Sequence, residues 1–348
     1  MNLIKLKRNC EILKKKIKNL KRTKFNYFFI INEIILINLK LENILFDRKN
    51  KKGDPIINCL QYLKIFERNM DELSELKNHD NKVFLKKKKF NKEISHRKLF
   101  ENLWLNYSFK EYKIDRIDRY IRRIKINKLE NIIKDKSVLD FGCGHGNFLM
   151  ACLNFKPKNC TGIDYGQKSV NFAKKMRDKF KFSKKKLKFK VSSVYKTGLK
   201  NESFDFVIQN GVFHHLKDEK KAYLEAYRVL KKNGYFWIYT DGGGGLRDII
   251  YDTCQQILRD IDKDFVINHI RLSGLKNGKE YHLGDNMNAE YRHTSYEKIV
   301  SFLKKIGFKN FKQMRGGFAT DFDKPFINDL YFKQKFGSGD LRILCQKV

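Results

Sequence analysis

The sequence predicts an α/β fold built on a doubly wound, mostly parallel sheet, and two observations lead to that prediction. Apolar runs of strand length alternate with amphipathic segments of helix length from residue 137 onward, a pattern that favours parallel pairing with right-handed crossovers. The nonapeptide VLDFGCGHG at 138–146 joins an apolar strand to three glycines and then to a helix. Such a turn is typical of a ligand site at the edge of a sheet.

The expected elements follow from these apolar runs and from the turn residues between them. Strands are predicted near residues 137–141, 159–164, 187–191, 204–210, 234–240, 308–314 and 340–347. Helices are predicted near residues 146–155, 167–180, 218–232 and 295–307. The last two strands lie close together without a helix between them, so we expect the seventh strand to be antiparallel.

The glycine spacing indicates the kind of ligand. Gly142, Gly144 and Gly146 follow a G-x-G-x-G pattern, whereas dinucleotide sites use G-x-G-x-x-G. Asp164 ends the next apolar run, CTGIDYG, 24 residues after Asp140. A carboxylate at a strand tip can accept both hydroxyls of a ribose. Together these features predict an adenosine-containing ligand with little phosphate to bind.

Here the chain resembles the class I S-adenosylmethionine-dependent methyltransferases, in particular those of types 11 and 12. Their first motif reads acid-x-Gly-x-Gly-x-Gly, as do residues 140–146. FDFVIQNGVFHHL at 204–216 and YRVLKKNGYFWIYT at 227–240 look like the fourth and fifth strand regions of the family. The resemblance covers residues 94–348. It implies a Rossmann-like sheet of seven strands, an antiparallel last strand and S-adenosyl-L-methionine as cofactor.

The resemblance also implies the cofactor-binding residues. Asp140 would fix the glycine turn or the methionine amino group, Asp164 the ribose, and Tyr165 would lie against the adenine. Where the family often has an acid at the third strand tip, this chain reads VSSVY, so Ser193 and the backbone of Val194 are expected there instead. The full expected set is Asp140, Gly142, Cys143, Gly144, Gly146, Asp164, Tyr165, Ser193, Val194, Asn210 and Gly211. The last two are expected to border the reacting methyl group.

Two histidines are the candidate catalytic residues. His214 and His215 fall in the turn after the fourth strand, where a histidine can take the acceptor's proton near neutral pH. Hydrogen bonding of each histidine to a neighbouring loop is an equally good interpretation, and the family frequently has a histidine here without a catalytic role. No metal site is predicted.

Two insertions, residues 241–293 and 315–337, are expected to form a roof over the ligand face and to select the substrate. They contain a polar mixture that suits a charged metabolite better than a lipid: Arg247, Arg271, Tyr281, His282, Tyr291, Arg292, His293 and Arg315. Glycines follow Asp241 and precede a helix expected from Leu246, so Gly243, Gly244, Gly245 and Arg247 are candidates for binding an anionic acceptor. Tyr291 and Arg292 are the other candidate substrate contacts. A flexible glycine turn is the alternative.

Residues 1–93 are predicted to be a basic, mostly helical accessory region, and residues 94–348 the methyltransferase domain. The boundary follows a solvated stretch at 77–93. The amphipathic helix expected over residues 1–22 can pack on the body, pair with a second copy in a homodimer, or lie on an anionic membrane; packing is favoured. In the domain's first helix, Trp104 is a candidate neighbour of the sulfonium or a core residue.

Composition limits partners and compartment. The net charge of +36 makes nucleic acid a candidate partner. However, the positive charge is spread along the chain, and 58 lysines outnumber 17 arginines. A lysine-rich chain is less suited to phosphate recognition than an arginine-rich one. Nucleic acid is therefore not favoured as a partner. Polar residues interrupt the apolar stretch 25–46, so no membrane span is predicted. Seven cysteines without a C-x-x-C pair indicate reduced thiols and a cytoplasmic protein.

Three functions fit these features. The first is a methyltransferase acting on an O, N or S atom of a small, polar metabolite or sugar derivative, which can be anionic. The second is an RNA- or protein-modifying methyltransferase; QNGVFHH lacks the Asn/Asp-Pro-Pro-aromatic clamp of base N-methylation and the Pro-Cys nucleophile of cytosine C5 chemistry. The third is a non-catalytic cofactor-binding scaffold, which intact glycines and Asp164 disfavour. The sequence leaves the acceptor and the oligomeric state open.

Overall fold

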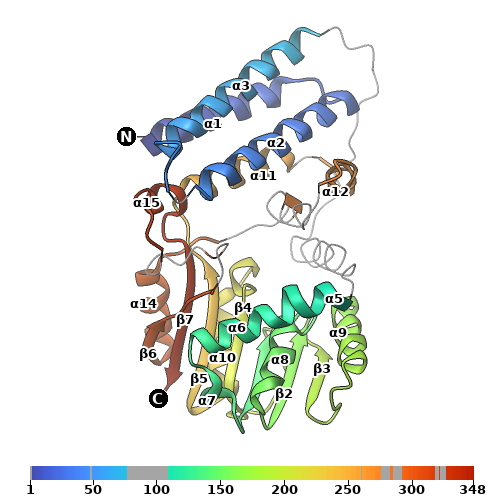
Figure 1. Cartoon of the computed structure of the whole chain (residues 1–348), viewed down its shortest axis with the longest axis vertical. Helices are drawn as coiled ribbons and strands as arrows, with labels where there is room; N and C mark the ends of the chain where they lie inside the picture. Colours follow the sequence, from blue (N-terminus) through green and yellow to red (C-terminus); the bar gives the residue numbers. More distant parts are fainter. Residues whose placement is uncertain are drawn as a thin grey trace. The chain divides into compact units, whose positions relative to one another are not determined.

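The computed structural model describes residues 2–47, 49–76, 109–259, 261–275, 283–284, 292–317, 321 and 327–348. The chain forms two compact units (Figure 1). The helical unit comprises Met1–Leu99, Gly243–Glu290 and Ile327–Gly337, and the sheet unit comprises Phe100–Gly242, Tyr291–Phe326 and Ser338–Val348. The domain boundary predicted at residue 93, and Trp104, lie outside the described residues.

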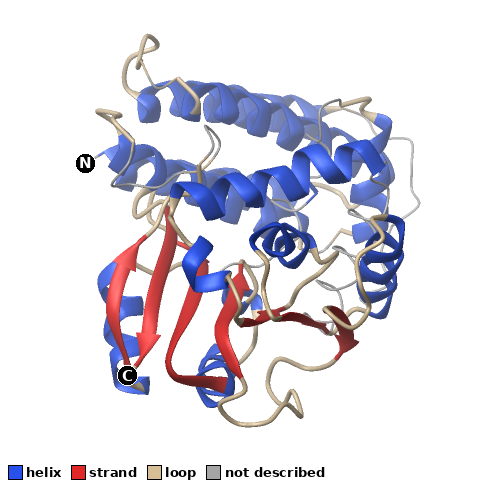
Figure 2. Ribbon diagram, turned by 60° about the horizontal axis from the view of Figure 1, so that its bottom comes forward, coloured by secondary structure: helices blue, strands red, loops and turns tan. Residues whose placement is uncertain are grey.

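The sheet unit contains one seven-stranded sheet in the order β3-β2-β1-β4-β5-β7-β6, drawn in red in Figure 2. Its strands are β1 Ser137–Phe141, β2 Asn159–Asp164, β3 Leu187–Val191, β4 Phe204–Asn210, β5 Leu230–Asp241, β6 Phe308–Gln313 and β7 Asp340–Lys347. The first five strands pair in parallel, whereas β7 is antiparallel to both β5 and β6. The predicted fold class and the antiparallel last strand are therefore confirmed.

The start of β5 differs from the prediction. The preceding helix, α10 Glu219–Val229, ends three residues before the predicted end at 232, and the strand begins at Leu230 rather than near 234. The pairing with β4 shifts register between Phe204 and Phe206, and Asn233 has a φ of 62°. An irregularity here lets the chain turn from helix to strand within a continuous extended segment.

Helices cover both faces of the sheet. Along the strands, Val138 and Phe206 belong to one buried core, while the adjacent Leu139 and Val207 belong to the other, as the two-residue period of a strand requires. The first core includes residues of α6 Asp118–Ile126, α8 Asn147–Cys152 and α9 Gln167–Lys179, together with the short elements α5 Phe109–Glu111, η1 Tyr112–Ile117 and α7 Glu130–Ile133. The second includes residues of α10 and of α14 Tyr296–Ile306. The short 3₁₀ turns are η2 Leu153–Phe155 and η3 Phe213–His215.

The helical unit gathers segments that are far apart in the sequence. Its helices are α1 Asn2–Asn19, α2 Lys24–Leu45, α3 Pro55–Glu75, α11 Leu246–Leu258, α12 Lys263–Leu272 and α15 Phe332–Phe336. Helix α1 packs against α3 and α11, burying Leu6, Cys10 and Leu13. As expected for a cap followed by Pro55, the Asp54 carboxylate accepts from the Ile56 amide at 2.8 Å. The N-terminal helices thus pack within a unit that also contains residues from both predicted insertions.

A buried lysine connects segments of the helical unit that are far apart in the sequence. Lys335 on α15 donates to the Asp47 carbonyl at 2.8 Å, to Asn50 Oδ1 at 2.9 Å and to the Asp329 carboxylate at 3.0 Å. Because a buried ammonium must be paired and hydrogen-bonded, this interaction links α15 to the segment between α2 and α3.

The seven cysteines are all buried and none forms a disulfide. Among the helices that the structure describes, none combines the length and the apolar composition that crossing a membrane requires.

The two-faced core makes a stability prediction. Leu303 on α14 is fully buried, while Leu224 on α10 is 45% exposed. Leu303→Ala should lower the free energy of unfolding by about 2 to 5 kcal/mol, because burial is lost and a cavity remains, whereas Leu224→Ala should change it by less than about 0.5 kcal/mol. Urea unfolding followed by fluorescence of the buried Trp237 measures this unit. Equal effects of the two substitutions would contradict the description of this core.

Candidate active site

The glycine turn after β1 has one side packed and one side open. Gly142, Gly144 and Gly146 have φ values of 66°, 50° and 79°, a region that favours glycine. A Cβ on Gly142 would lie 2.6 Å from a Val212 methyl group, whereas a Cβ on Gly144 would meet nothing within 4 Å. Gly144 therefore faces space that a ligand can enter, and Gly142 is required by the close approach of the turn after β4.

Asp164 connects the end of β2 to this turn. Its Oδ2 accepts a hydrogen bond from the Gly144 amide at 2.8 Å, and its Oδ1 accepts one from the Gly166 amide at 2.7 Å. Each carboxylate oxygen has two lone pairs, so the same group can still accept ribose hydroxyls. This geometry fits the role implied for Asp164 by the sequence.

Asp140 is a buried carboxyl group at the end of β1. Its side chain is buried, and among the described residues Oδ1 has no hydrogen-bond partner. Burial raises the pKa of Asp140 well above its usual value, and the nearby Asp164 raises it further. An unsatisfied buried oxygen is costly, and a cationic group such as the methionine ammonium would satisfy it. The open face of Gly144 and this orphaned oxygen fit S-adenosylmethionine.

The other predicted cofactor residues lie along the same edge of the sheet. Cys143 is buried, and its Sγ would lie 2.7 Å from a Cβ on Gly162, so close packing accounts for a glycine in β2. Tyr165 is 55% exposed directly after β2. Ser193 Oγ accepts from the Tyr195 amide at 3.2 Å, and Val194 is buried. None of these contacts conflicts with an adenosine at this edge.

Asn210 and Gly211 sit between aromatic side chains. Asn210 Oδ1 accepts from Trp237 Nε1 at 3.3 Å, and its Nδ2 donates to the Tyr120 hydroxyl at 3.1 Å. Gly211 has a φ of 82°, and a Cβ on it would lie 3.1 Å from the Tyr239 ring. The aromatic rings thus fix the position of the predicted methyl-bordering pair.

Gln209 shapes the turn that carries the histidines. This fully buried residue accepts from the amides of Val212 and Phe213 at 3.1 and 3.3 Å, and it donates to the Tyr239 carbonyl at 2.9 Å. The amide side chain therefore satisfies the free backbone groups at the start of η3 and connects the turn to β5.

The two histidines are in direct contact. Nε2 of His214 and Nε2 of His215 are 2.8 Å apart, and Nδ1 of His214 lies 3.3 Å from Thr240 Oγ1. Burial lowers the pKa of His214 well below its usual value, and His215 lowers it further. His214 is therefore neutral near pH 7, and it is better suited to orient His215, which is half-buried, than to hold a proton itself.

Residues 292–294 lie beside this histidine turn. The Arg292 amide donates to the His214 carbonyl at 3.1 Å, and the Thr294 amide donates to the Asp241 carbonyl at 3.2 Å. His293 Nδ1 lies 3.1 Å from the Asp241 carboxylate. The Arg292 side chain donates to the Lys217 carbonyl at 2.8 Å, which places this predicted substrate contact next to the histidines. Tyr291 lies outside the described residues.

The predicted anion site at 243–247 belongs to the helical unit. Two of its expected hydrogen-bond donors are already bonded to a carboxylate of the chain itself. Asp248 accepts from the Gly245 amide and from Arg247 Nε, each at 3.0 Å. A Cβ on Gly245 would lie 2.6 Å from the Lys335 carbonyl oxygen, so backbone packing explains this glycine. Gly244 has a φ of 99° and Gly243 precedes it in the same turn. Binding of an external anion here stays a prediction.

Sequence reasoning missed His145 and Tyr112. Burial lowers the pKa of His145 to about 4, with a further lowering from Arg116, and its Nε2 has no hydrogen-bond partner among the described residues. The Tyr112 hydroxyl donates to the His145 carbonyl. The histidine inside GCGHG was visible in the motif, but Tyr112 is 33 residues away in sequence, so no local pattern could pair them.

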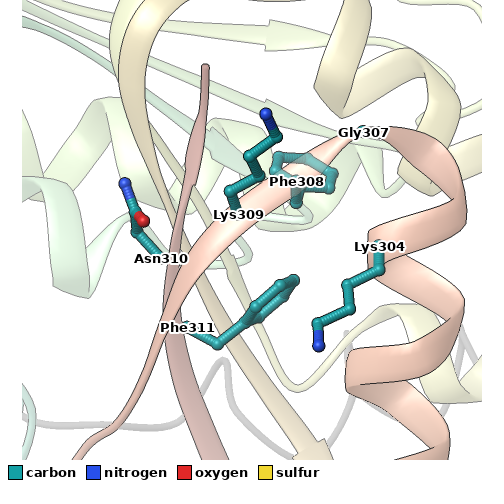
Figure 3. Close-up of a pocket in the computed structure, with 6 residues that line it drawn as sticks. All are labelled: Lys304, Gly307, Phe308, Lys309, Asn310 and Phe311. Carbon is teal, nitrogen blue, oxygen red and sulfur yellow. The ribbon is translucent and has the colours of Figure 1, made fainter.

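The pocket shown in Figure 3 lies elsewhere on the sheet unit. It sits where α14 leads into β6 and is lined by Lys304, Gly307, Phe308, Lys309, Asn310 and Phe311. Because β6 runs parallel to β5, its first residues lie at the amino end of the sheet, opposite the glycine turn. It is not part of the candidate active site.

A Rossmann-like sheet with an antiparallel seventh strand and a glycine turn beside two carboxylates is typical of α/β proteins that bind adenosine-containing ligands. Residues 132–287 match the family model of a methyltransferase domain. The chain therefore contains a class I S-adenosylmethionine-dependent methyltransferase domain.

Three curated relatives have different substrates in their names. Human EEF1A lysine methyltransferase 2 is 30% identical over 37% of this chain and 55% of its own length. Human arsenite methyltransferase is 32% identical over 30% of this chain and 31% of its own. The tRNA U34 carboxymethyltransferase of Helicobacter pylori (strain P12) is 31% identical over 38% and 51%. The matches span about half or less of these relatives, which share the domain but not one substrate class.

A pair of alanine substitutions tests which face of the turn meets the cofactor. Gly144→Ala should lower the free energy of unfolding by about 1 to 2 kcal/mol, the cost of a left-handed alanine, and should weaken S-adenosylmethionine binding at least tenfold, since its Cβ enters the open space. Gly142→Ala should lose more stability because of the Val212 contact. Calorimetric titration and urea unfolding separate the two effects. Normal cofactor affinity in a folded Gly144→Ala variant would place the ligand elsewhere.

The raised pKa of Asp140 leads us to predict that the free energy of unfolding depends on pH. Its pKa is raised in the folded protein, so its contribution is full below the unfolded-state pKa of about 3.9 and is lost as the pH rises through the folded-state value. Asp140→Asn cannot titrate. The cofactor-free variant should therefore gain stability relative to the wild type as the pH rises from 5 to 8, while binding S-adenosylmethionine more weakly. Urea unfolding at several pH values measures the difference, and a constant difference would contradict the burial of an ionisable Asp140.

Proposed function

We propose that the chain is an S-adenosylmethionine-dependent methyltransferase that acts on an O, N or S atom of a small, polar metabolite or sugar derivative, which can be anionic. The observation that carries this proposal is the histidine pair in the turn that begins with Asn210 and Gly211, because this turn packs against the glycine turn through Val212 and Gly142. A cofactor cradle and a candidate base thus meet at the carboxyl ends of the adjacent strands β1 and β4.

Methyl transfer from S-adenosylmethionine has two requirements that the protein must meet. Bound S-adenosylmethionine supplies a methyl group already activated by its sulfonium, so the chain has to align the acceptor in line with it and to remove the acceptor's proton. Asp140, the backbone of Gly142–Gly144 and Asp164 would hold the cofactor. Asn210 and Gly211, fixed by Trp237, Tyr120 and Tyr239, would border the acceptor.

The hydrogen bonds of the two histidines support different roles for them. When His214 donates from Nδ1 to Thr240, its Nε2 accepts from Nε2 of His215, and Nδ1 of His215 is then the unprotonated nitrogen. His215 takes the acceptor's proton there, and the charge stays on His215 because burial disfavours a charged His214. Thr240 and His214 are thus positioning residues. An amine or thiolate acceptor would need this base less than a hydroxyl would.

Modification of RNA or protein is the second candidate function. The net charge of +36 favours it, and relatives are named for tRNA and for a protein lysine. Against it stands the lack of an Asn/Asp-Pro-Pro-aromatic clamp in QNGVFHH and the dispersed, lysine-rich charge.

The direct test supplies the purified full-length protein with methyl-labelled S-adenosylmethionine and three separate acceptor pools: small metabolites, total RNA and total protein. Label should enter the small-metabolite pool, and mass spectrometry then identifies the acceptor. Transfer only to RNA, with a steep salt dependence, or only to protein would establish the second function. The absence of both cofactor binding and transfer would reject methyltransferase activity.

The assigned roles predict an order of effects. With a hydroxyl acceptor, His215→Ala should lower turnover about 100-fold or more, because the base is lost. Thr240→Val should lower it less, about tenfold, because only the tautomer preference is lost. Cofactor affinity, measured by calorimetry, should stay unchanged in both. Near-normal turnover of His215→Ala across neutral and mildly alkaline pH would exclude the base, and a larger loss in Thr240→Val would contradict the assigned order.

A further inference from the structure

Three arginines of the sheet unit meet one carboxylate. Oδ1 of Asp321 lies 2.9 Å from Arg342 Nη2, 3.3 Å from Arg123 Nη2 and 3.6 Å from Arg119 Nη2. Arg119 and Arg123 come from α6, and Arg342 is the third residue of β7. We call Arg119, Arg123, Arg342 and Asp321 the arginine cluster.

The cluster lies behind the two tyrosines that flank Asn210 and Gly211. The Arg342 guanidinium is 4.5 Å from the centre of the Tyr239 ring, and Tyr239 pairs with Asn210 in the sheet. A Cβ on Gly211 would lie 3.1 Å from the same ring. The Arg123 guanidinium is 5.2 Å from the centre of the Tyr120 ring, whose hydroxyl bonds Asn210. One aromatic ring therefore separates the cluster from the place proposed for methyl transfer.

Burial makes this concentration of positive charge expensive. The side chains of Arg342 and Arg123 are 2% and 5% exposed, and removing guanidinium groups from water is costly unless anions compensate them. A second carboxylate, Asp340, lies 3.3 Å from Arg342. Even so, the pKa of Arg123 is lowered, first by burial and next by repulsion from Arg342. The environment of Arg123 thus remains unfavourable to its positive charge.

The residue type is informative in a chain with 58 lysines and 17 arginines. Lysine is the common cation of this protein, yet the cluster uses arginine at all three positions. The planar guanidinium binds carboxylate and phosphate groups through paired hydrogen bonds, which an ammonium cannot do. The side chain of Arg119 is 27% exposed, so solvent reaches the cluster at Arg119.

We propose that Arg119 and Arg342 bind a carboxylate or phosphate group of the methyl acceptor beside the Tyr239 ring, with Asp321 as the internal carboxylate that holds the guanidinium groups and competes with the ligand. That the anion belongs to the methyl acceptor rests on the proposed function, whereas the anion site itself does not. The site selects acceptors in which the anionic group and the methylated atom are separated by about one aromatic ring.

The experiment uses the full-length protein with inorganic phosphate and succinate as separate probes and succinamide as the neutral control. Line broadening in ³¹P and ¹³C spectra measures binding. Wild-type protein should bind both anions but not succinamide. Arg119→Gln should weaken anion binding at least tenfold, whereas Arg122→Gln, an exposed neighbour on the same helix, should leave it unchanged. Asp321→Asn should bind the anions more tightly, because the internal competitor is lost.

The outcomes separate the anion site from the proposed function. Failure of the wild type to bind either anion overturns the anion site, as does equal weakening by Arg122→Gln, which would indicate only general surface charge. If the buried Arg342→Gln variant does not fold, the partly exposed Arg119→Gln variant decides. Calorimetry with S-adenosylmethionine is run on every variant. Retained cofactor binding with lost anion binding supports the cluster, whereas a wild type that binds no cofactor rejects the proposed function independently of the anion result.

Discussion

The site depends on the hydrogen bonds that the amides of Gly144 and Gly166 donate to the Asp164 carboxylate. They attach the turn after β1 to the end of β2, so two strands that are parallel neighbours also share one ligand edge. Asp140 lies in β1 just before this turn, and its buried oxygen Oδ1 lacks a partner among the described residues. Close packing of Gly142 against Val212 brings the turn after β4 to the same place. The Asp164 carboxylate and the packing of Gly142 thus bring three strand ends together.

Local sequence patterns predicted most of the sheet unit. The predicted bounds of β1, β2, β3, β4 and β7 match the structure. The continuous apolar runs of β1 and β4 are typical of parallel strands buried on both faces, whereas β3 alternates buried and exposed residues and β7 is antiparallel. The start of β5 was misplaced because Gly234 and Asn233 resemble a turn that separates two elements. In the structure they form an irregularity within an extended segment instead. Sequence alone does not distinguish a bulge from a turn when both favour positive φ.

The candidate site could be predicted only where its residues are close in sequence. The glycine turn, Asp164 and the histidine pair belong to short motifs, and they are found together at the sheet edge. The Thr240 contact with His214 and the grouping of Arg123, Asp321 and Arg342 join residues from separate elements. Such pairings depend on strand order and on the hand of the crossovers, so they become visible only once the sheet is assembled.

The discontinuity of the helical unit has a consequence for how the chain acquires its structure during synthesis. Lys335 reaches residues 288 and 285 positions earlier, Asp47 and Asn50, and Leu246–Leu258 packs against the first helix. The amino-terminal helices pack on one another, but their other partners, α11, α12 and α15, are translated only after most of the sheet strands. Contacts of such long sequence separation form late, which leaves the early helices with exposed apolar faces while the ribosome completes the chain. A holding chaperone would have its longest opportunity to act on these first 76 residues.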